Sequence, residues 1–408
     1  MKKFFALLLS LAMVLALVAC GQKDPTPDTP DTPDDPQTKV EYKVAMITDY
    51  GDITDQSFNQ TTYEACKAFA EDNSIEFSYF KPAGDNTADR VAMIEKAVDE
   101  GFNVIVMPGY AFGGAIVEAA PEFPDVKFIA LDVAAGDLLE TAVAKAGEAY
   151  DYTPENWDLN KYVDMSNVYC AVYQEELCGY MAGYAAVKLG YKNLGFLGGM
   201  SVPAVVRYGY GFVQGVDAAA ADLGLTDVKL NYIYGGQFFG DADITAVMDT
   251  WYQGGTEVVF ACGGGIYTSA VDAAKKANAK VIGVDVDQAG VIAKYAGVDG
   301  MTVTSAMKGL YPATYDTLTD VIVNGNWDKY VGKIATLGLV SGTDPEANYV
   351  QIPMGDGTQW SDSFTQDDYK AMVADMFDGK VTVSNDTKKA AKDFATVITV
   401  NDQGQIKG

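Results

Sequence analysis

Short apolar runs of five or six residues alternate along this chain with longer segments in which apolar residues recur every three or four positions. The first run covers residues 44–48, ends at Asp49, and is followed by turn residues and by Ser57 at a helix start. The same alternation gives a helix over 57–73, strands over 76–80, 103–107 and 126–131, and helices over 87–101 and 114–120. Because no hairpin signal separates the strands, the pattern predicts right-handed crossovers and a parallel sheet covered by helices.

The second half of the chain repeats this architecture. Strands are predicted at 167–173, 193–197, 229–234, 257–261, 281–285 and 302–305, with helices from 175, 268 and 311. A chain of 408 residues is too long for one ordinary core, which favours two lobes. We expect a first lobe from 42–174 and 300–328, a second lobe from 175–299 and 329–397, and a tail over 398–408 that is frayed from residue 403.

The amino terminus carries an export pattern. Lys2 and Lys3 precede an apolar run over 4–18, and the run ends in Leu-Val-Ala-Cys20. This predicts a signal peptide over 1–19, and its ending looks like a bacterial lipobox with Cys20 as the lipid-modified residue. A plain cleaved signal with an incidental cysteine is the alternative. Residues 20–41 are rich in proline and aspartate, repeat Thr-Pro-Asp three times, and predict an extended tether to the extracytoplasmic face of the bacterial cell membrane.

Composition narrows the function classes. The formal net charge is −27, from 29 basic and 56 acidic residues, which argues against nucleic acid as a partner. The chain has no histidine, so Ser-His catalysis and His-ligated zinc are excluded and an enzyme is disfavoured. The cysteines beyond Cys20 form no C-x-x-C pair and lie beside apolar patterns, as small buried residues do.

Polar residues follow several predicted strands at the edge where an open α/β sheet binds ligands. Asp49, Phe58 and Asn59 follow the first strand, and Asp132 follows the strand over 126–131. An acidic acceptor, an aromatic face and an amide suit a neutral polar ring compound. The alternatives are structural: Phe58 as a hydrophobic staple, Asn59 as an early-helix residue, and Asp132 as a turn former.

Three motifs carry a resemblance to a known family. They are Thr48-Asp49 with Asp55-Gln-Ser-Phe-Asn-Gln60, the run from Gly198 to Arg207 followed by Gly211-Phe212, and Gly283-Val-Asp285-Val-Asp-Gln288. Together they resemble the basic membrane protein family of lipoproteins, whose best understood members are purine nucleoside receptors of ABC importers. The resemblance implies a type I periplasmic-binding-protein fold, in which two Rossmann-like lobes with parallel sheets are joined by a hinge. It also implies an ABC importer permease as partner, no catalysis, no cofactor or metal, and a monomer. Residues 368–377 and 379–383 resemble the family's terminal helix and strand.

The resemblance also assigns roles to residues. It implies that a purine base lies between Phe58 and Phe260, with Phe239 as the second choice for the latter wall. It implies that Asp49, Asn59 and Asp132 bind polar edges, and that the backbone at Gly264 approaches the ligand closely. Asp285 and Lys308 would hold ribose, since a carboxylate accepts well from two adjacent hydroxyls. Taken alone, Phe260 is typical of a core aromatic and Lys308 of a surface lysine.

Other interpretations stay open on the sequence alone. The same fold also serves receptors for sugars and other small neutral metabolites. A calcium-dependent nucleoside hydrolase would use the aspartates of 48–55 together with Asp285 and Asp287. A phosphate cradle at the glycines after residue 197 is disfavoured, because neither phosphate-loop motif is present. Gly179 and Gly183 have the spacing of a membrane dimer motif, but the short apolar span around them favours close packing of a helix on a sheet.

Overall fold

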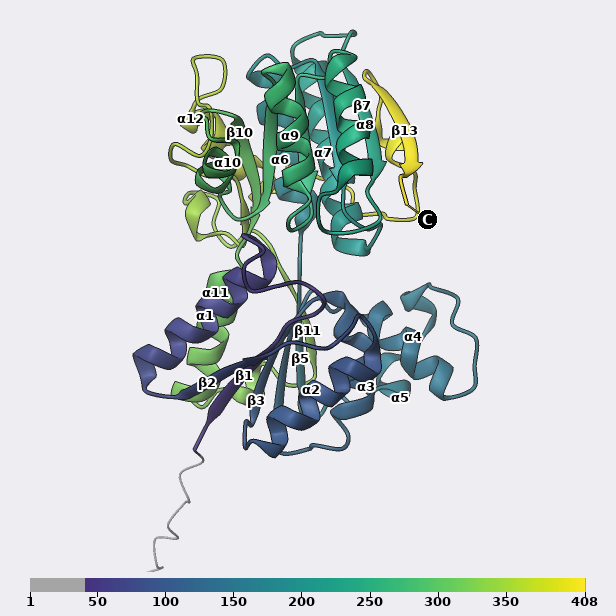
Figure 1. Ribbon diagram of the computed structural model, residues 1–408, viewed down its shortest axis with the longest axis vertical. Coiled ribbons are helices and arrows are strands. Elements are labelled where there is room, and N and C mark those ends of the chain that lie inside the picture. The colour runs from purple at the N-terminus through teal and green to yellow at the C-terminus, as the bar shows by residue number, and fades with distance from the viewer. Residues whose placement is uncertain (1–40, 408) are drawn as a thin grey trace, which may run out of the picture. The chain divides into compact units, whose positions relative to one another are not determined.

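Two separate β-sheets organise residues 41–407, the part of the chain that the computed structural model describes. The predicted signal peptide, Cys20 and the tether up to residue 40 lie outside these residues. The first sheet has six strands in the order β11-β5-β4-β3-β1-β2, and the second has seven in the order β12-β10-β9-β8-β6-β7-β13. All neighbours in both sheets are parallel except β12, which is antiparallel to β10. Figure 1 shows both sheets flanked by helices.

The first lobe carries its strands and helices in alternation. Its strands are β1 (Lys43–Ile47), β2 (Glu76–Phe80), β3 (Val104–Pro108), β4 (Lys127–Leu131), β5 (Val168–Tyr173) and β11 (Lys333–Leu337). Its helices are α1 (Phe58–Asn73), α2 (Thr87–Asp99), α3 (Gly113–Ala119), α4 (Ala135–Lys145), α5 (Leu159–Tyr162) and α11 (Leu310–Leu318). Successive residues of β1 point to opposite faces, so that Val44 and Met46 pack in a different core cluster from Ala45 and Ile47. Both faces are buried, which explains the unbroken apolar runs.

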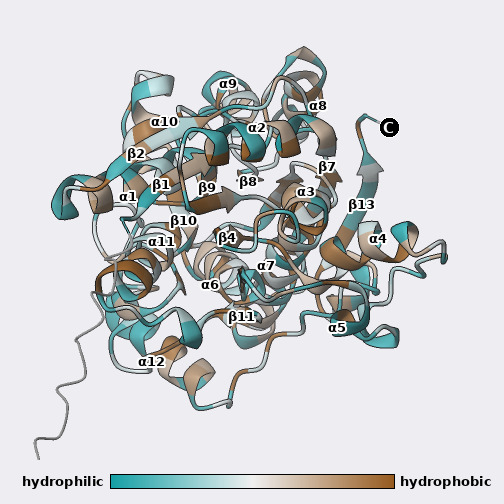
Figure 2. Ribbon diagram, turned by 90° about the horizontal axis from the view of Figure 1, so that it is seen from below, coloured by the Kyte–Doolittle hydropathy of each residue, from teal (hydrophilic) through white to brown (hydrophobic). Residues whose placement is uncertain are grey.

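The second lobe follows the same rule. Its strands are β6 (Asn193–Gly198), β7 (Lys229–Tyr234), β8 (Val258–Cys262), β9 (Lys280–Asp285), β10 (Thr302–Lys308), β12 (Val350–Gln351) and β13 (Thr399–Gln405). Its helices are α6 (Glu175–Lys188), α7 (Pro203–Asp222), α8 (Ala242–Gln253), α9 (Tyr267–Ala277), α10 (Ala289–Ala296) and α12 (Gln366–Phe377). Figure 2 shows hydrophobic colouring along the central strand β9 and more hydrophilic colouring on peripheral helices such as α12. The four cysteines at 66, 170, 178 and 262 are free and buried, as expected.

The chain passes between the two sheets three times within the described residues: between β5 and α6, between β10 and α11, and between β11 and β12. The crossing segments are hydrogen-bonded to one another. Gln174 N donates to Leu337 O at 2.9 Å, Tyr349 N to Gly338 O at 3.0 Å, and Gly309 N to Tyr349 O at 2.7 Å. These bonds make the crossings a small three-segment hinge.

Four expectations about the later part of the chain are wrong. Residues 302–308 fall in the expected first lobe, but β10 pairs with β9 in the second sheet; residues 333–337 fall in the expected second lobe, but β11 pairs with β5 in the first. The expected tail instead contains β13, which pairs in parallel with β7 and lies beside it in Figure 1. No strand forms over 379–383. A strand pattern shows which residues form a strand, but the sheet that this strand joins depends on partners far away in the sequence.

The glycines of α6 contact a helix and not a sheet. A β-carbon at Gly179 would overlap the carbonyl oxygen of Tyr208 in α7, and one at Gly183 would overlap that of Phe212. Gly211 and Gly215 of α7 face Glu176 and Tyr180 in the same way. The missing side chains let the two helix backbones approach closely.

Candidate functional site

A cavity of about 600 Å³ lies between the two lobes, at the carboxyl ends of β1, β4, β8 and β9 and beside the end of β10. This is the edge at which open α/β sheets bind ligands. Seven of the eight expected site residues line the cavity: Asp49, Phe58, Asn59, Asp132, Gly264, Asp285 and Lys308. Three of these come from the second lobe, so a ligand here contacts both lobes.

Lys308 is the centre of a buried charge cluster. Its ammonium lies 2.5 Å from Asp132 Oδ2, 3.5 Å from Glu175 Oε1 and 3.7 Å from Asp285 Oδ1. It also lies 4.7 Å from the centre of the Phe58 ring. Burial lowers the pKa of Lys308, but the attraction of Asp132, Asp285 and Glu175 outweighs it and raises that pKa overall. Lys308 is therefore a fixed, charged donor, and the alternative of a solvated surface lysine is wrong.

Asp132 and Asp285 take the same unusual backbone conformation. Asp132 directly follows β4 and Asp285 ends β9, and each has a positive φ, 60° for Asp132 and 64° for Asp285. Aspartate tolerates this left-handed region better than most residues, and such positions concentrate at ligand sites. The conformation turns both carboxylates toward Lys308 at the end of β10. Asp132 Oδ1 is buried without a hydrogen-bond partner, which leaves an acceptor at the cavity.

Asp49 and Asn59 form the part of the site that belongs to the first lobe alone. Gly51 N donates to Asp49 Oδ1 at 2.6 Å, and Asn59 Nδ2 donates to Asp55 Oδ2 at 3.1 Å. Because Asp55 fixes the amide of Asn59, the Asn59 Oδ1 atom is left as a buried acceptor without a partner. Burial raises the pKa of Asp49 to about 6. Asp49 therefore changes charge within the range of ordinary buffers.

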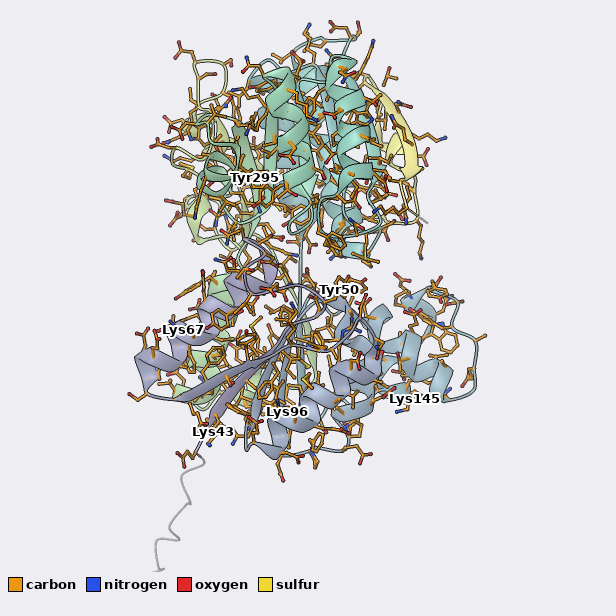
Figure 3. The ribbon with its side chains drawn as sticks, viewed as in Figure 1. Lys43, Tyr50, Lys67, Lys96, Lys145 and Tyr295 are labelled. Carbon is orange, nitrogen blue, oxygen red and sulfur yellow. The ribbon has the colours of Figure 1, made fainter. Side chains whose placement is uncertain are left out.

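Aromatic rings line the cavity from both lobes. Phe58 at the start of α1 and Tyr50 after β1 come from the first lobe, and Phe238 and Phe239 precede α8 in the second. Tyr50 and Phe238 stack across the cleft, with ring centres 6.0 Å apart and an interplanar angle of 18°. Figure 3 labels Tyr50, whose side chain extends from the end of the first lobe at which this cavity lies. Phe239 is 62% exposed, which leaves its ring open to a ligand.

Phe260 is not a wall of the cavity. It is the third residue of β8, it is fully buried, and its ring packs on Phe196, Tyr208 and Phe212. Its side chain points to the sheet face that α7 covers, whereas the cavity begins where the strand ends at Cys262. The core interpretation of Phe260 is correct. Phe238 and Phe239 supply the aromatic surface of the second lobe, and Phe239 was the second choice from the sequence.

Gly264 lines the cavity with a φ of +44°, a conformation that side chains rarely adopt. A β-carbon at this position would lie 3.1 Å from the carbonyl oxygen of Phe238. Gly264 therefore keeps the backbone after β8 close to the aromatic wall.

Several residues of the site were missed by the sequence analysis. Tyr50, Phe238, Arg207 and Asp137 line the cavity, and Ser57 is bonded to the cavity residue Asp285. Ser57 was predicted as a helix cap, but its hydroxyl makes no cap and donates to Asp285 in the second lobe. Tyr50 directly follows Asp49 and Phe238 adjoins Phe239, so both could have been predicted from neighbours that were already candidates. Nothing in the sequence pointed to Asp137, because it lies inside a helix of a segment whose role the sequence does not reveal.

The arrangement required for a calcium-dependent hydrolase does not form. No group of three or more Asp, Glu, Cys or His side chains in residues 41–407 is placed to hold a metal ion. Asp287 is exposed, and its carboxylate accepts from the backbone of Ala289 instead of facing the aspartates after β1.

Comparison with known proteins identifies the family. The sequence profile described as "ABC transporter substrate-binding protein PnrA-like", of the Bmp family, matches residues 42–343. The chain belongs to the Bmp family. This confirms the resemblance carried by the motifs at Asp49, Arg207 and Asp285, because the match spans most of both lobes.

Relatives of this Bmp family member agree with that assignment. The chain is 25% identical over 389 residues to the "ABC transporter nucleoside-binding protein BmpA" of Lactococcus lactis, covering 92% of this chain and 96% of the relative. It is 26% identical over 320 residues to an "uncharacterized lipoprotein" of Pyrococcus abyssi, covering 74% and 69%. The fold is similar to that of an ABC transporter solute-binding protein from Aeropyrum pernix, with a TM-score of 0.60 and 20% identity over 86% of this chain and 90% of that one.

The Bmp family member therefore has the type I periplasmic-binding-protein fold and is a substrate-binding protein of an ABC transporter, not an enzyme. A permease and a small-molecule ligand are its implied partners. Lipoproteins among the relatives imply an extracytoplasmic location. Within the part of the chain that the structure describes, every helix is too short or too polar to cross a membrane.

Proposed function

We propose that this Bmp family member is a lipid-anchored receptor that captures purine nucleosides for an ABC importer. The observation that carries the proposal is the pairing, in one cavity, of aromatic rings from both lobes with the cluster of Lys308, Asp132 and Asp285. A nucleoside has a flat apolar base and a sugar with adjacent hydroxyls, so it requires these two surfaces side by side.

The base would lie against Phe58 and the ring of Phe238 or Phe239. Stacking on an aromatic side chain contributes about 1 to 3 kcal/mol per base. Tyr50 and Phe238 are 6.0 Å apart, which is less than a base stacked between them would need at about 3.5 Å per contact. A base that entered between Tyr50 and Phe238 would therefore have to separate these two rings.

The sugar would lie at Asp285 and Lys308, and Asp49, Asn59 and Asp132 would bind polar edges of the ligand. Supporting this, Asp285 is an acceptor at the carboxyl end of β9 and Lys308 is held in its charged form by its neighbours. Charge-assisted hydrogen bonds to a carboxylate are about twice as strong as neutral ones. The carboxylate of Asp285 therefore suits the two adjacent hydroxyls of a ribose.

Nucleotides are expected to bind poorly. The cavity is lined by seven aspartates and by only two basic residues, Lys308 and Arg207. Both bases already have carboxylate partners, since Arg207 Nε donates to Glu175 Oε2 at 2.7 Å. A phosphate would add negative charge to a site that already carries an excess of it.

The export pattern extends the proposal to the location. Cys20 would be the lipid-modified residue and residues 20–41 the tether, and lipoproteins among the relatives support this. The name of the Lactococcus lactis relative, a nucleoside-binding protein, supports the choice of ligand.

Native mass spectrometry of the protein without residues 1–19 tests the proposal. The protein would be measured as purified and then with a mixed panel of purine nucleosides and sugars. A mass shift equal to one purine nucleoside is the expected result and names the base. Binding of a sugar in place of a nucleoside would move the function to the sugar receptor, which the same fold also serves, and competition between ribose and inosine would separate the two.

A further inference from the structure

The cavity has more room than a nucleoside needs. At about 30 Å³ per water in the liquid, 600 Å³ corresponds to about 20 waters, whereas a purine nucleoside has about 19 or 20 non-hydrogen atoms that are packed more closely by covalent bonds. The proposed base and ribose contacts also leave part of the wall unused. That part is formed by Asp137 of α4 and Arg207 of α7, which both line the cavity.

Asp137 offers an unused acceptor. Its Oδ2 atom accepts from Ala134 N at 2.7 Å and so holds the start of α4. No donor among the described residues reaches its other oxygen, and the residue belongs to the long segment between β4 and β5 for which the sequence suggests no role. Burial raises the pKa of Asp137 to about 7, and the charge of Arg207 opposes this rise. Asp137 and Arg207 line the same cavity, one from α4 and the other from α7.

Arg207 offers unused donors. Its Nε atom is bound to Glu175, but its two terminal amino groups make no hydrogen bond to the described residues. The side chain is 15% exposed and the residue lines the cavity. A guanidinium with a free terminal edge is suited to bind a carboxylate through two parallel hydrogen bonds.

The corner of Asp137 and Arg207 adjoins the sugar end of the site. Glu175 connects Arg207 to Lys308, since its Oε2 accepts from Arg207 Nε while its Oε1 lies 3.5 Å from Lys308 Nζ. A group attached to the ribose of a nucleoside bound at Lys308 and Asp285 would therefore lie beside this corner.

We propose that Asp137 and Arg207 form a second subsite for a zwitterionic amino-acid group carried on the sugar of the nucleoside, with Asp137 binding its ammonium and Arg207 its carboxylate. The proposal rests on the proposed function, because it needs the nucleoside to place the group. One free acceptor beside one set of free donors matches a zwitterion. A phosphate would use Arg207 but be repelled by Asp137, and a simple amine would leave Arg207 without a partner.

The test compares pairs of ligands that differ only in this group. Adenosine and inosine are titrated beside S-adenosylhomocysteine and S-inosylhomocysteine, which carry an amino-acid group on the 5′ carbon through a thioether. Isothermal titration calorimetry gives Kd for each. We expect at least one thioether derivative to bind about tenfold or more tightly than its parent nucleoside.

The variant Asp137→Asn isolates the proposed contact. It keeps an oxygen to accept from Ala134 N and removes only the negative charge. We expect this variant to raise the Kd of the thioether derivative about tenfold or more, while the Kd of the parent nucleoside changes less than about threefold. Asp393→Asn is the matched control, because Asp393 accepts from Ala390 N at 3.0 Å in the same three-residue spacing but is exposed and does not line the cavity.

The outcomes separate the two proposals. If adenosine, inosine or guanosine binds but both thioether derivatives bind more weakly than their parents, the second subsite is wrong and the nucleoside receptor stands. An equal loss for parent and derivative in Asp137→Asn would also overturn the subsite. If none of the three nucleosides binds, the proposed function fails.

Discussion

Ser57 in the first lobe donates a 2.6 Å hydrogen bond to the carboxylate of Asp285 in the second. Ser57 immediately precedes α1 and Asp285 ends β9, so this bond joins the two lobes across the cavity. Next to it, Gln288 Nε2 donates to the carbonyl oxygen of Gln56 at 3.2 Å. The residue proposed to bind ribose therefore also connects the lobes.

Replacing Asp285 is expected to affect binding far more than replacing Ser57. Asp285→Ala removes a charged acceptor proposed to bind two hydroxyls, so nucleoside affinity should fall about tenfold or more. Ser57→Ala removes one donor and keeps the carboxylate, so affinity should change by less than about fivefold. Isothermal titration of both variants measures this. Equal affinity of Asp285→Ala and the wild type would refute the ribose assignment.

The two phenylalanines at 239 and 260 are expected to respond in opposite ways. Phe239→Ala should weaken ligand binding by about tenfold and leave the free energy of unfolding nearly unchanged, because the ring is 62% exposed. Phe260→Ala should lower the free energy of unfolding by about 3 to 5 kcal/mol, because it opens a cavity in a packed core. Urea unfolding and ligand titration measure both. A binding defect in Phe260→Ala without loss of stability would restore the sandwich that the sequence predicts.

Removal of the Lys308 charge is expected to destabilise the folded protein. Lys308→Met leaves the buried carboxylates of Asp132 and Glu175 without their shared cation, and breaking a buried ion pair in this way costs about 3 to 5 kcal/mol. Chemical unfolding at pH 7 checks the value. Lys276→Met serves as the control, because Lys276 pairs with Asp249 on the surface and such pairs contribute at most about 1 kcal/mol. Similar decreases in the free energy of unfolding in both variants would contradict the prediction that the buried cluster stabilises the fold.

Asp49 is expected to make stability depend on pH. Its pKa is about 6 in the folded protein against an ordinary 3.8, so folding favours its neutral form. Its stabilising effect is complete below pH 4 and is lost as pH rises through 6, a difference of about 3 kcal/mol. Asp49→Asn keeps the acceptor for Gly51 N and should therefore be more stable than the wild type at pH 7 to 8. The advantage should shrink toward pH 4, which thermal melts across this range would show; a constant difference would count against the raised pKa.

The contact between α6 and α7 is expected to tolerate no added side chain. Gly179→Ala places a methyl group against the backbone of Tyr208 and should lower the free energy of unfolding by about 1 to 3 kcal/mol. Gly290→Ala is the matched control, since Gly290 lies in α10 with open space around it and alanine favours a helix. Urea unfolding should show a neutral or stabilising effect there. If Gly179→Ala left the free energy of unfolding unchanged, α6 and α7 would be able to move apart freely.

The sequence alone determined the class of fold and the place of the site. Apolar runs alternating with helical patterns require a parallel sheet covered on both faces, and polar residues after those runs must meet at one edge of the sheet. Asp49, Asn59, Asp132 and Asp285 could be named for this reason, whereas Lys308 was named only through the family resemblance, which also made the other assignments specific.

The tertiary structure decided everything that depends on distant partners. A strand pattern shows that residues 302–305 form a strand, but only pairing with β9 places β10 in the second sheet. No strand was predicted for β11 or β13, which form because they pair with β5 and β7. Alternation along a strand leaves open which face turns to the core, so Phe260 and Phe239 were ranked in the wrong order. Ser57 and Asp137 could not be identified from the sequence, because Ser57 bonds to Asp285 and Asp137 shares the cavity with Arg207, and these partners are far away in the sequence.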